Sequence, residues 1–121
     1  QRAIHHAIRS GPRGDVPGPL KVWLHSPALA ERAQALGAFC RYQSSLPPRL
    51  SELAILVTGA IWRAGYEWAS HVAHGLRAGL SPALLDALRR GERPEGMTAE
   101  EAAVHDFAAE LHRDRTVSAA T

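Results

Sequence analysis

The sequence contains a single cysteine, Cys40, so no disulfide can form within the chain. One unpaired thiol fits a reducing compartment. No apolar run reaches the roughly 18 residues that a transmembrane helix requires. Residues 1–6 lack the apolar segment of a signal peptide. These absences predict a cytoplasmic protein with no membrane partner.

Aromatic residues and an excess of one charge are also scarce. Aromatics make up 6% of the chain, and the formal net charge is +2. The arginines are scattered among acids, without the basic stripe and stacking aromatics of nucleic-acid-binding proteins. The apolar fraction of 45% is ordinary for a soluble globular protein. The length of 121 residues predicts a single domain over residues 1–121. The distribution of charge predicts no nucleic-acid partner.

Proline, glycine and capping residues divide the chain into helices. Ser-Pro pairs at 26–27 and 81–82 combine an N-cap with proline at the first helical position. Thr98 to Glu101 has the pattern of a capping box. The punctuation predicts an all-α domain of six or seven helices. They are expected near residues 4–8, 20–24, 27–42, 48–64, 66–78 and 82–88, and from 99 onward.

Helical periodicity gives expectations about the core. Residues 53–57 are apolar and could form a buried strand or helix, but their proline start and neighbours favour a central helix. Glu52 is the only charged residue from 51 to 61, so it is expected to point inward. The apolar positions of the helices at 27–42 and from 99 onward are expected to be buried. They are Leu29, Ala33, Leu36 and Cys40, and then Ala102, Ala103, Phe107, Ala108 and Leu111.

Glu67 and His71 stand four residues apart on one predicted helix face. A carboxylate next to an imidazole fixes its tautomer and raises its basicity, which suits proton transfer. The alternative is an exposed pair of little consequence. A second alternative adds His74, because two imidazoles and a carboxylate could hold zinc or iron. The spacing lacks the His-Glu-x-x-His pattern, and we predict no metal and no cofactor.

Three segments together resemble the carboxymuconolactone decarboxylase family, which includes the alkylhydroperoxidase D branch. They are Leu46-Pro47-Pro48-Arg49-Leu50-Ser51-Glu52-Leu53-Ala54-Ile55-Leu56, Tyr66-Glu67-Trp68 with His71, and Ala78-Gly79-Leu80-Ser81. Residues 18–20 and 24–27 resemble an uncharacterised branch of the family. The likeness, over roughly residues 10–115, implies an all-helical fold with its site between two central helices. It also implies dimers, trimers or hexamers, and a domain that continues past Thr121, so truncation at the C-terminus is expected.

The resemblance can be carried over position by position. His71, eight residues before Gly79, matches the histidine of the alkylhydroperoxidase D motif, and Glu52 matches its upstream glutamate. The two cysteine positions of Cys-x-x-Cys fall on Ala64 and Glu67. Because thiol peroxidases need a thiolate and a resolving thiol, peroxidase activity is disfavoured. Cys40 lies outside the motif and is expected in the core.

Glu52, Glu67 and His71 are therefore the predicted catalytic residues of a cofactor-free lyase or isomerase. The expected substrate is a small carboxylated or lactone compound. Two alternatives remain: an alkylhydroperoxidase or peroxiredoxin-like antioxidant protein, and a non-catalytic helical oligomer in which Glu52 and His71 only lock two helices together. The candidate substrate-binding residues are Arg49, Tyr66, Trp68 and His74, although packing or a solvated helix start would also explain them. The five other histidines, His5, His6, His25, His105 and His112, are expected at the surface or hydrogen-bonded.

Overall fold

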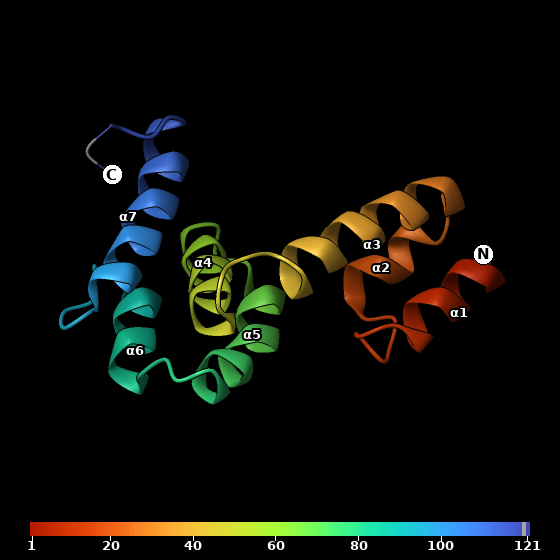
Figure 1. The fold of residues 1–121 in the computed structure, drawn as a ribbon, viewed down its shortest axis with the longest axis horizontal. Helices are drawn as coiled ribbons and strands as arrows, with labels where there is room; N and C mark the ends of the chain where they lie inside the picture. The colour runs from red at the N-terminus through yellow and green to blue at the C-terminus, as the bar shows by residue number, and fades with distance from the viewer. Residues whose placement is uncertain (120) are drawn as a thin grey trace. The chain divides into compact units, whose positions relative to one another are not determined.

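A computed structural model describes residues 1–119 and 121 (Figure 1). Within them the chain forms seven helices and no strand, which confirms the all-α prediction. None of these helices is long and apolar enough to cross a membrane. The chain divides into two compact units, residues 1–45 and residues 46–121. The expectation of one domain over residues 1–121 stays a prediction.

The first unit is built from three helices: α1 (Arg2–Ser10), α2 (Gly18–Trp23) and α3 (Pro27–Tyr42). Its buried core consists of Ile8, Val16 and Leu20. Ile4, Trp23 and Leu24 are partly buried and pack against this cluster. The core therefore draws on α1, α2 and the loop between them, and α3 contributes little to it.

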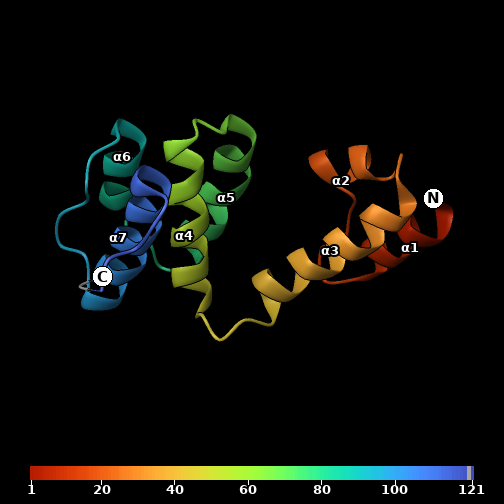
Figure 2. The same cartoon turned by 90° about the horizontal axis from the view of Figure 1, so that it is seen from above.

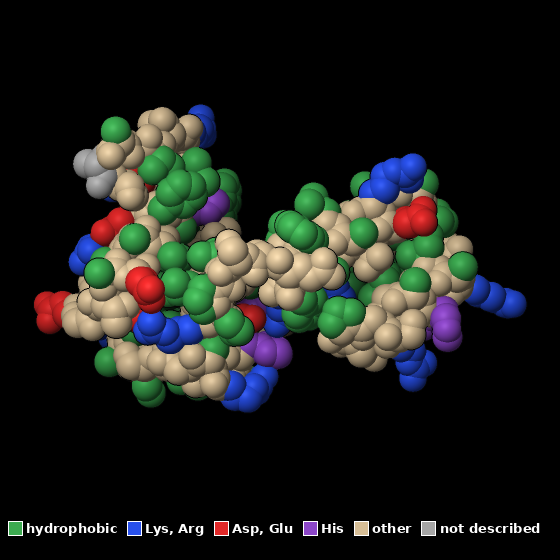
Figure 3. Space-filling view, in the orientation of Figure 1, with side chains coloured by type: hydrophobic (Ala, Val, Ile, Leu, Met, Phe, Trp, Pro, Cys, Tyr) green, Lys and Arg blue, Asp and Glu red, His purple; other side chains and the backbone are tan. Residues whose placement is uncertain are grey.

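The expected buried stripe on α3 is wrong. Leu29 is 52% exposed and Leu36 is 66% exposed, while Ala30 is the buried residue of the helix. Cys40 is exposed as well, so its assignment to the core is also wrong. The physical reason is that a cluster of three buried side chains is too small to cover the apolar face of a 16-residue helix. Hydrophobic side chains accordingly lie at the surface over α3 (Figure 3).

The second unit holds α4 (Pro48–Ile61), α5 (Gly65–Arg77), α6 (Pro82–Arg90) and α7 (Ala99–Asp114). Helix α4 lies between α5 and α7 and also contacts α6 (Figure 2). Leu53, Leu56 and Val57 of α4 are at most 2% exposed and form the centre of the core. Leucines of α6, together with Leu80 and Ala108, complete it. The prediction that residues 53–57 belong to a central helix is confirmed.

The helix ends lie at the capping residues and glycines that the sequence predicted. The Ser81 hydroxyl accepts a hydrogen bond from the Leu84 amide, and α6 ends at Gly91 in the left-handed region with φ of 77°. The capping box of α7 is present, with Thr98 and Glu101 each accepting from the backbone of the other. The Glu101 carboxylate also accepts a hydrogen bond from Arg49. This one side chain therefore caps α7 and ties it to the start of α4.

The buried face of α7 differs from the expected one. Phe107 is 51% exposed and Leu111 is 42% exposed, and Ala103 is exposed as well. The buried residues are Glu101, His105 and Ala108, which are spaced along one face. Two of them are polar, and they can face inward because Arg49 and Asp106 satisfy them. The periodicity of apolar residues carries no information about hydrogen-bond partners of polar side chains. The buried positions expected on α7 were therefore wrong except at Ala108.

Trp62, His112 and Thr58 connect the end of α7 to the end of α4. The Trp62 indole Nε1 donates to His112 Nδ1 at 3.1 Å, so Nδ1 carries no hydrogen. The hydrogen is therefore on Nε2, which lies 3.1 Å from Thr58 Oγ1 and donates to it. The Thr58 hydroxyl in turn donates to the Ala54 carbonyl at 2.9 Å. Each donor in this series of three hydrogen bonds has an acceptor.

We expect His112→Ala to lower the free energy of unfolding by about 1 kcal/mol, because it removes both hydrogen bonds of the imidazole. Urea denaturation followed by circular dichroism measures the change. His25→Ala is the control, since His25 is exposed and has no described side-chain bond. Equal stability of the two variants would show that the network does not hold α7 to α4.

Candidate functional site

Two small residues let α5 lie close to α4. Gly75 is buried, and a Cβ there would come within 2.9 Å of Leu56 Cδ1 and 3.0 Å of Leu80 Cδ1. Gly59 of α4 is also buried, and its Cβ would meet the Trp68 backbone at 3.8 Å and Glu67 Cβ at 3.9 Å. A side chain at Gly75 would force the Leu56 and Leu80 side chains to shift. The close approach brings polar side chains of α4 and α5 within hydrogen-bonding distance.

Glu52 on α4 and His71 on α5 form a buried pair. Each residue is 7% exposed, and His71 Nδ1 lies 2.7 Å from Glu52 Oε2. Because the ionised carboxylate can only accept, Nδ1 carries the hydrogen and donates it. The expectation that Glu52 points inward is confirmed. Burial of a carboxylate without such a partner would be costly.

Glu67 approaches the other nitrogen of the same ring. Its Oε2 lies 3.5 Å from His71 Nε2, one helical turn away, and its side chain is 44% exposed. The two predicted catalytic carboxylates, Glu52 and Glu67, therefore approach the two nitrogens of the His71 ring. The four-residue spacing predicted the contact between Glu67 and His71. The distance is that of an ion pair rather than a short hydrogen bond. The Glu52 carboxylate of the set is buried, and the Glu67 carboxylate is partly exposed to water.

This arrangement can hold and move a proton. Since Glu52 fixes the hydrogen on Nδ1, only Nε2 of His71 is available to take up or release a proton. Glu52 then stabilises the imidazolium that forms, and Glu67 is positioned to exchange the proton with Nε2 or with solvent. The geometry supports acid/base chemistry, and the catalytic roles of the three residues stay predictions.

The four predicted substrate-binding residues have different surroundings. Arg49 is engaged by Glu101 and lies 3.8 Å from Glu100, which gives it a role in joining α4 to α7. Trp68 is partly buried and packs on the core. Tyr66 is 51% exposed. His74 is exposed, its ring centroid lies 5.9 Å from that of His71, and its Nδ1 is 2.9 Å from Arg77 Nη2. His74 is thus exposed next to His71, and Tyr66 is exposed at the start of α5.

The positions of the cysteine, histidine and acidic side chains do not favour a thiol peroxidase site or a metal site. Ala64, at the first cysteine position, is the N-cap residue of α5, and Glu67 occupies the second. Cys40, the one cysteine, belongs to α3 in the other unit. Over residues 1–119 and 121, no three histidine, cysteine or acidic side chains are arranged as ligands of one ion. The alternative of zinc or iron on Glu67, His71 and His74 is therefore not supported by their positions.

Sequence reasoning missed a second polar group, on α7. His105 is 7% exposed, and its Nδ1 lies 2.8 Å from Asp106 Oδ1. Arg93 holds the same carboxylate with two hydrogen bonds of 2.9 and 2.8 Å. These bonds from Arg93, helped by His105, lower the pKa of Asp106 to about 2. No sequence pattern pointed to the group, because Arg93 lies in a loop 13 residues before Asp106.

The helices that carry Glu52, Glu67 and His71 fall within a region shared with known proteins. Residues 27–110 match the Carboxymuconolactone decarboxylase family. The chain belongs to this family. The match extends from the start of α3 through most of α7 and includes every predicted site residue. No curated protein and no solved structure matches the chain. Membership supports the all-helical fold and a place in the decarboxylase and alkylhydroperoxidase-like superfamily, and leaves the specific activity open.

The Arg93–Asp106 pair predicts an acid-sensitive part of the stability. The folded-state pKa of Asp106, about 2, is below its ordinary value of 3.8. The pair therefore stabilises the fold above about pH 4, and this contribution is lost as the pH falls toward 2. Because the Asp106 side chain is 39% exposed, we expect an effect of about 1 kcal/mol or less.

Urea denaturation at pH 6, 4 and 2.5 measures this contribution. Asp106→Asn should lose less stability than the unmodified chain between pH 4 and 2.5, because it has no carboxylate to protonate there. Asp86→Asn, which removes an exposed carboxylate of α6, serves as the control and should follow the unmodified chain. Parallel curves for Asp106→Asn and the unmodified chain would contradict the assignment.

Proposed function

We propose that this member of the carboxymuconolactone decarboxylase family is a cofactor-free acid/base lyase or isomerase. Its substrate is a small carboxylated or lactone compound. The observation that carries the proposal is the single imidazole of His71 between a buried carboxylate at 2.7 Å and a half-exposed carboxylate at 3.5 Å. Such a set provides a base, a group that stabilises its charged form, and a route for the proton to solvent.

The proposed chemistry uses only proton transfer. In an isomerisation, His71 Nε2 removes a proton from the carbon next to a carbonyl, the electron pair moves into the carbonyl as an enolate, and the proton returns at another carbon. In a decarboxylation, the bond to the carboxylate breaks, carbon dioxide leaves, and the enolate takes its proton from His71. Glu52 stabilises the imidazolium in both cases, and Glu67 restores the proton balance with solvent.

The two alternatives rest on different features. A thiol peroxidase would need cysteines at positions 64 and 67, where the chain has Ala64 and Glu67. A non-catalytic oligomer would use the Glu52–His71 bond only to join α4 and α5, a role that its burial also permits. The half-exposed carboxylate favours catalysis over this second alternative, because locking two helices requires no group at the surface.

Turnover of a panel of lactones and β-keto acids tests the proposal. We expect Glu67→Gln to lower kcat about 100-fold or more on an accepted substrate, because it removes a proton-transferring group. Since the side chain is 44% exposed, the fold should change little, which circular dichroism checks. Glu95→Gln, an exposed carboxylate in the loop before α7, is the control and should keep full activity.

Peroxide reduction is the counter-assay. Thiol-dependent turnover that Cys40→Ser abolishes would overturn the acid/base proposal in favour of a peroxidase. Full activity of Glu67→Gln would remove Glu67 from the mechanism. Absence of turnover across the whole panel, with Glu52→Gln impairing only stability, would favour the non-catalytic oligomer.

We also propose that the chain self-associates as a dimer, trimer or hexamer. Large apolar side chains of the first unit are exposed: Val22, Leu29, Leu36, Phe39 and Tyr42. Burying them against a second copy would release water from apolar surface. Light scattering at micromolar concentration should give a mass above the 13.1 kDa of one chain. Leu36→Asp should lower that mass, whereas a monomer before the substitution would contradict the proposal.

A further inference from the structure

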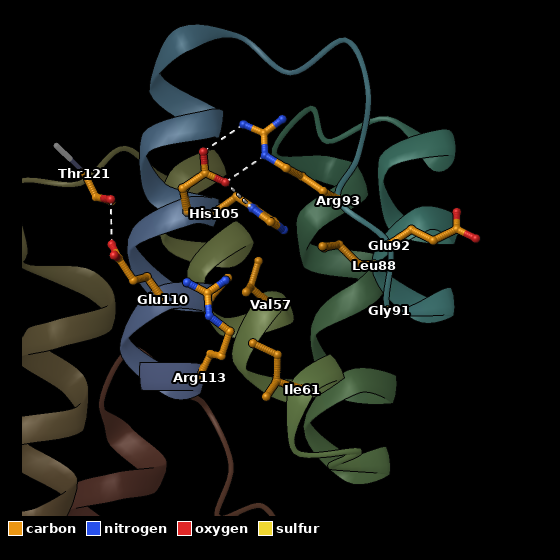
Figure 4. A pocket seen from close by; sticks show the side chains of 12 residues that line it. Val57, Ile61, Leu88, Gly91, Glu92, Arg93, His105, Glu110, Arg113 and Thr121 are labelled. Carbon is orange, nitrogen blue, oxygen red and sulfur yellow. Dashed lines mark hydrogen bonds and ion pairs between the residues drawn. The ribbon is translucent and has the colours of Figure 1, made fainter. Parts of the chain in front are cut away.

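The second unit contains a cavity on the side of α4 away from Glu52 and His71. Its volume is about 500 Å³, within the range of about 300–1,000 Å³ typical of small-molecule sites. Val57 and Ile61 of α4 and Leu88 of α6 provide apolar walls, and α7 provides the opposite side (Figure 4). None of the lining residues belongs to the proposed catalytic set. The cavity is therefore separate from the proton-transfer site.

His105 is the polar group that reaches into this cavity. Its ring extends from α7 toward Leu88 (Figure 4), and the residue is 7% exposed. Asp106 accepts from Nδ1, so Nδ1 carries the hydrogen and Nε2 of the neutral ring has a free lone pair. Nε2 has no hydrogen-bond partner among the described residues. Nε2 is not one of the buried side-chain atoms that lack a partner, so it is accessible to water and to the donor group of a ligand.

The charged residues around the cavity are already paired with one another or with neighbours. Arg93 holds Asp106, and Arg113 holds Asp114 with bonds of 2.9 and 2.6 Å. Glu92 accepts from Arg90, and Glu110 accepts from Thr121 at 2.6 Å. The lining carries two arginines and three carboxylates, so its net charge does not favour an anion. The geometry favours an uncharged ligand that presents one hydrogen-bond donor to Nε2.

We propose that this cavity binds a small uncharged alcohol or phenol. The hydroxyl group donates to His105 Nε2, and the apolar body lies against Val57, Ile61 and Leu88. Asp106 and Arg93 act as positioning residues: Arg93 fixes the carboxylate, and the carboxylate fixes the imidazole tautomer that accepts the ligand's hydrogen. The site is independent of the proposed lyase or isomerase activity.

Phenol and anisole are matched probes, because methylation removes the donor hydrogen and leaves the ring. Titration of the full chain labelled with ¹⁵N-histidine should show saturable binding of phenol with a shift of the His105 Nε2 resonance. Anisole should bind about tenfold more weakly, the loss expected for one hydrogen bond. Benzoate tests for an anionic ligand and should bind more weakly than phenol.

Two variants separate the site from adventitious binding. His105→Phe should remove the preference for phenol over anisole. If this variant does not fold, the shift of the His105 Nε2 resonance in the unmodified chain still tests whether His105 contacts the ligand. Ala109→Leu fills the cavity from α7 and should abolish binding, whereas Ala103→Leu on the exposed face of α7 should not.

Several outcomes would overturn the proposal. They are the absence of saturable phenol binding, an unchanged His105 resonance on binding, equal affinity for anisole, and tighter binding of benzoate. Glu67→Gln, in which the fold should change little, should leave phenol binding unchanged, so failure of the proposed catalytic activity and failure of this site are distinguishable.

Discussion

Helix α4 has to bury a carboxylate as well as leucines, and the architecture of the second unit depends on how that carboxylate is satisfied. Glu52 is 7% exposed and is hydrogen-bonded to His71 at 2.7 Å. A buried charge left alone costs several kcal/mol, on the order of 3–5 kcal/mol when its partner is removed. The partner must therefore be held in place, which requires α5 to lie close to α4. Gly75 permits this approach, because its Cβ would otherwise meet Leu56 and Leu80 within about 3 Å.

The sequence predicted the helices and the candidate site better than it predicted the helix faces. Proline, glycine and capping residues act locally, so the ends of α4 to α7 lie within a few residues of their expected positions. The inward orientation of Glu52 also followed from local composition, since it is the only charge from 51 to 61. The spacing of Glu67 and His71 predicted their contact, because residues four apart on a helix are neighbours.

The errors have a common physical cause. On α7 the buried face contains Glu101 and His105, whose partners come from α4 and from the next residue, while Phe107 lies outside. On α3 the apolar positions exceed what a core of Ile8, Val16 and Leu20 can cover. Both outcomes depend on tertiary contacts, which hydrophobic periodicity does not encode. The Arg93–Asp106–His105 group was missed for the same reason.

The chain has Glu67 at a position where the family resemblance implies a thiol, and a carboxylate supports different reactions from a thiol. The resemblance to alkylhydroperoxidase D-type proteins implies a cysteine at that position, where a thiolate would attack peroxide. A carboxylate there cannot form a disulfide, but it can exchange a proton with His71 Nε2 at 3.5 Å and with water. The glutamate and histidine that would have served the thiols remain in place and in contact. Since a proton relay needs only these groups, their contact supports the proposed reactions at carbon.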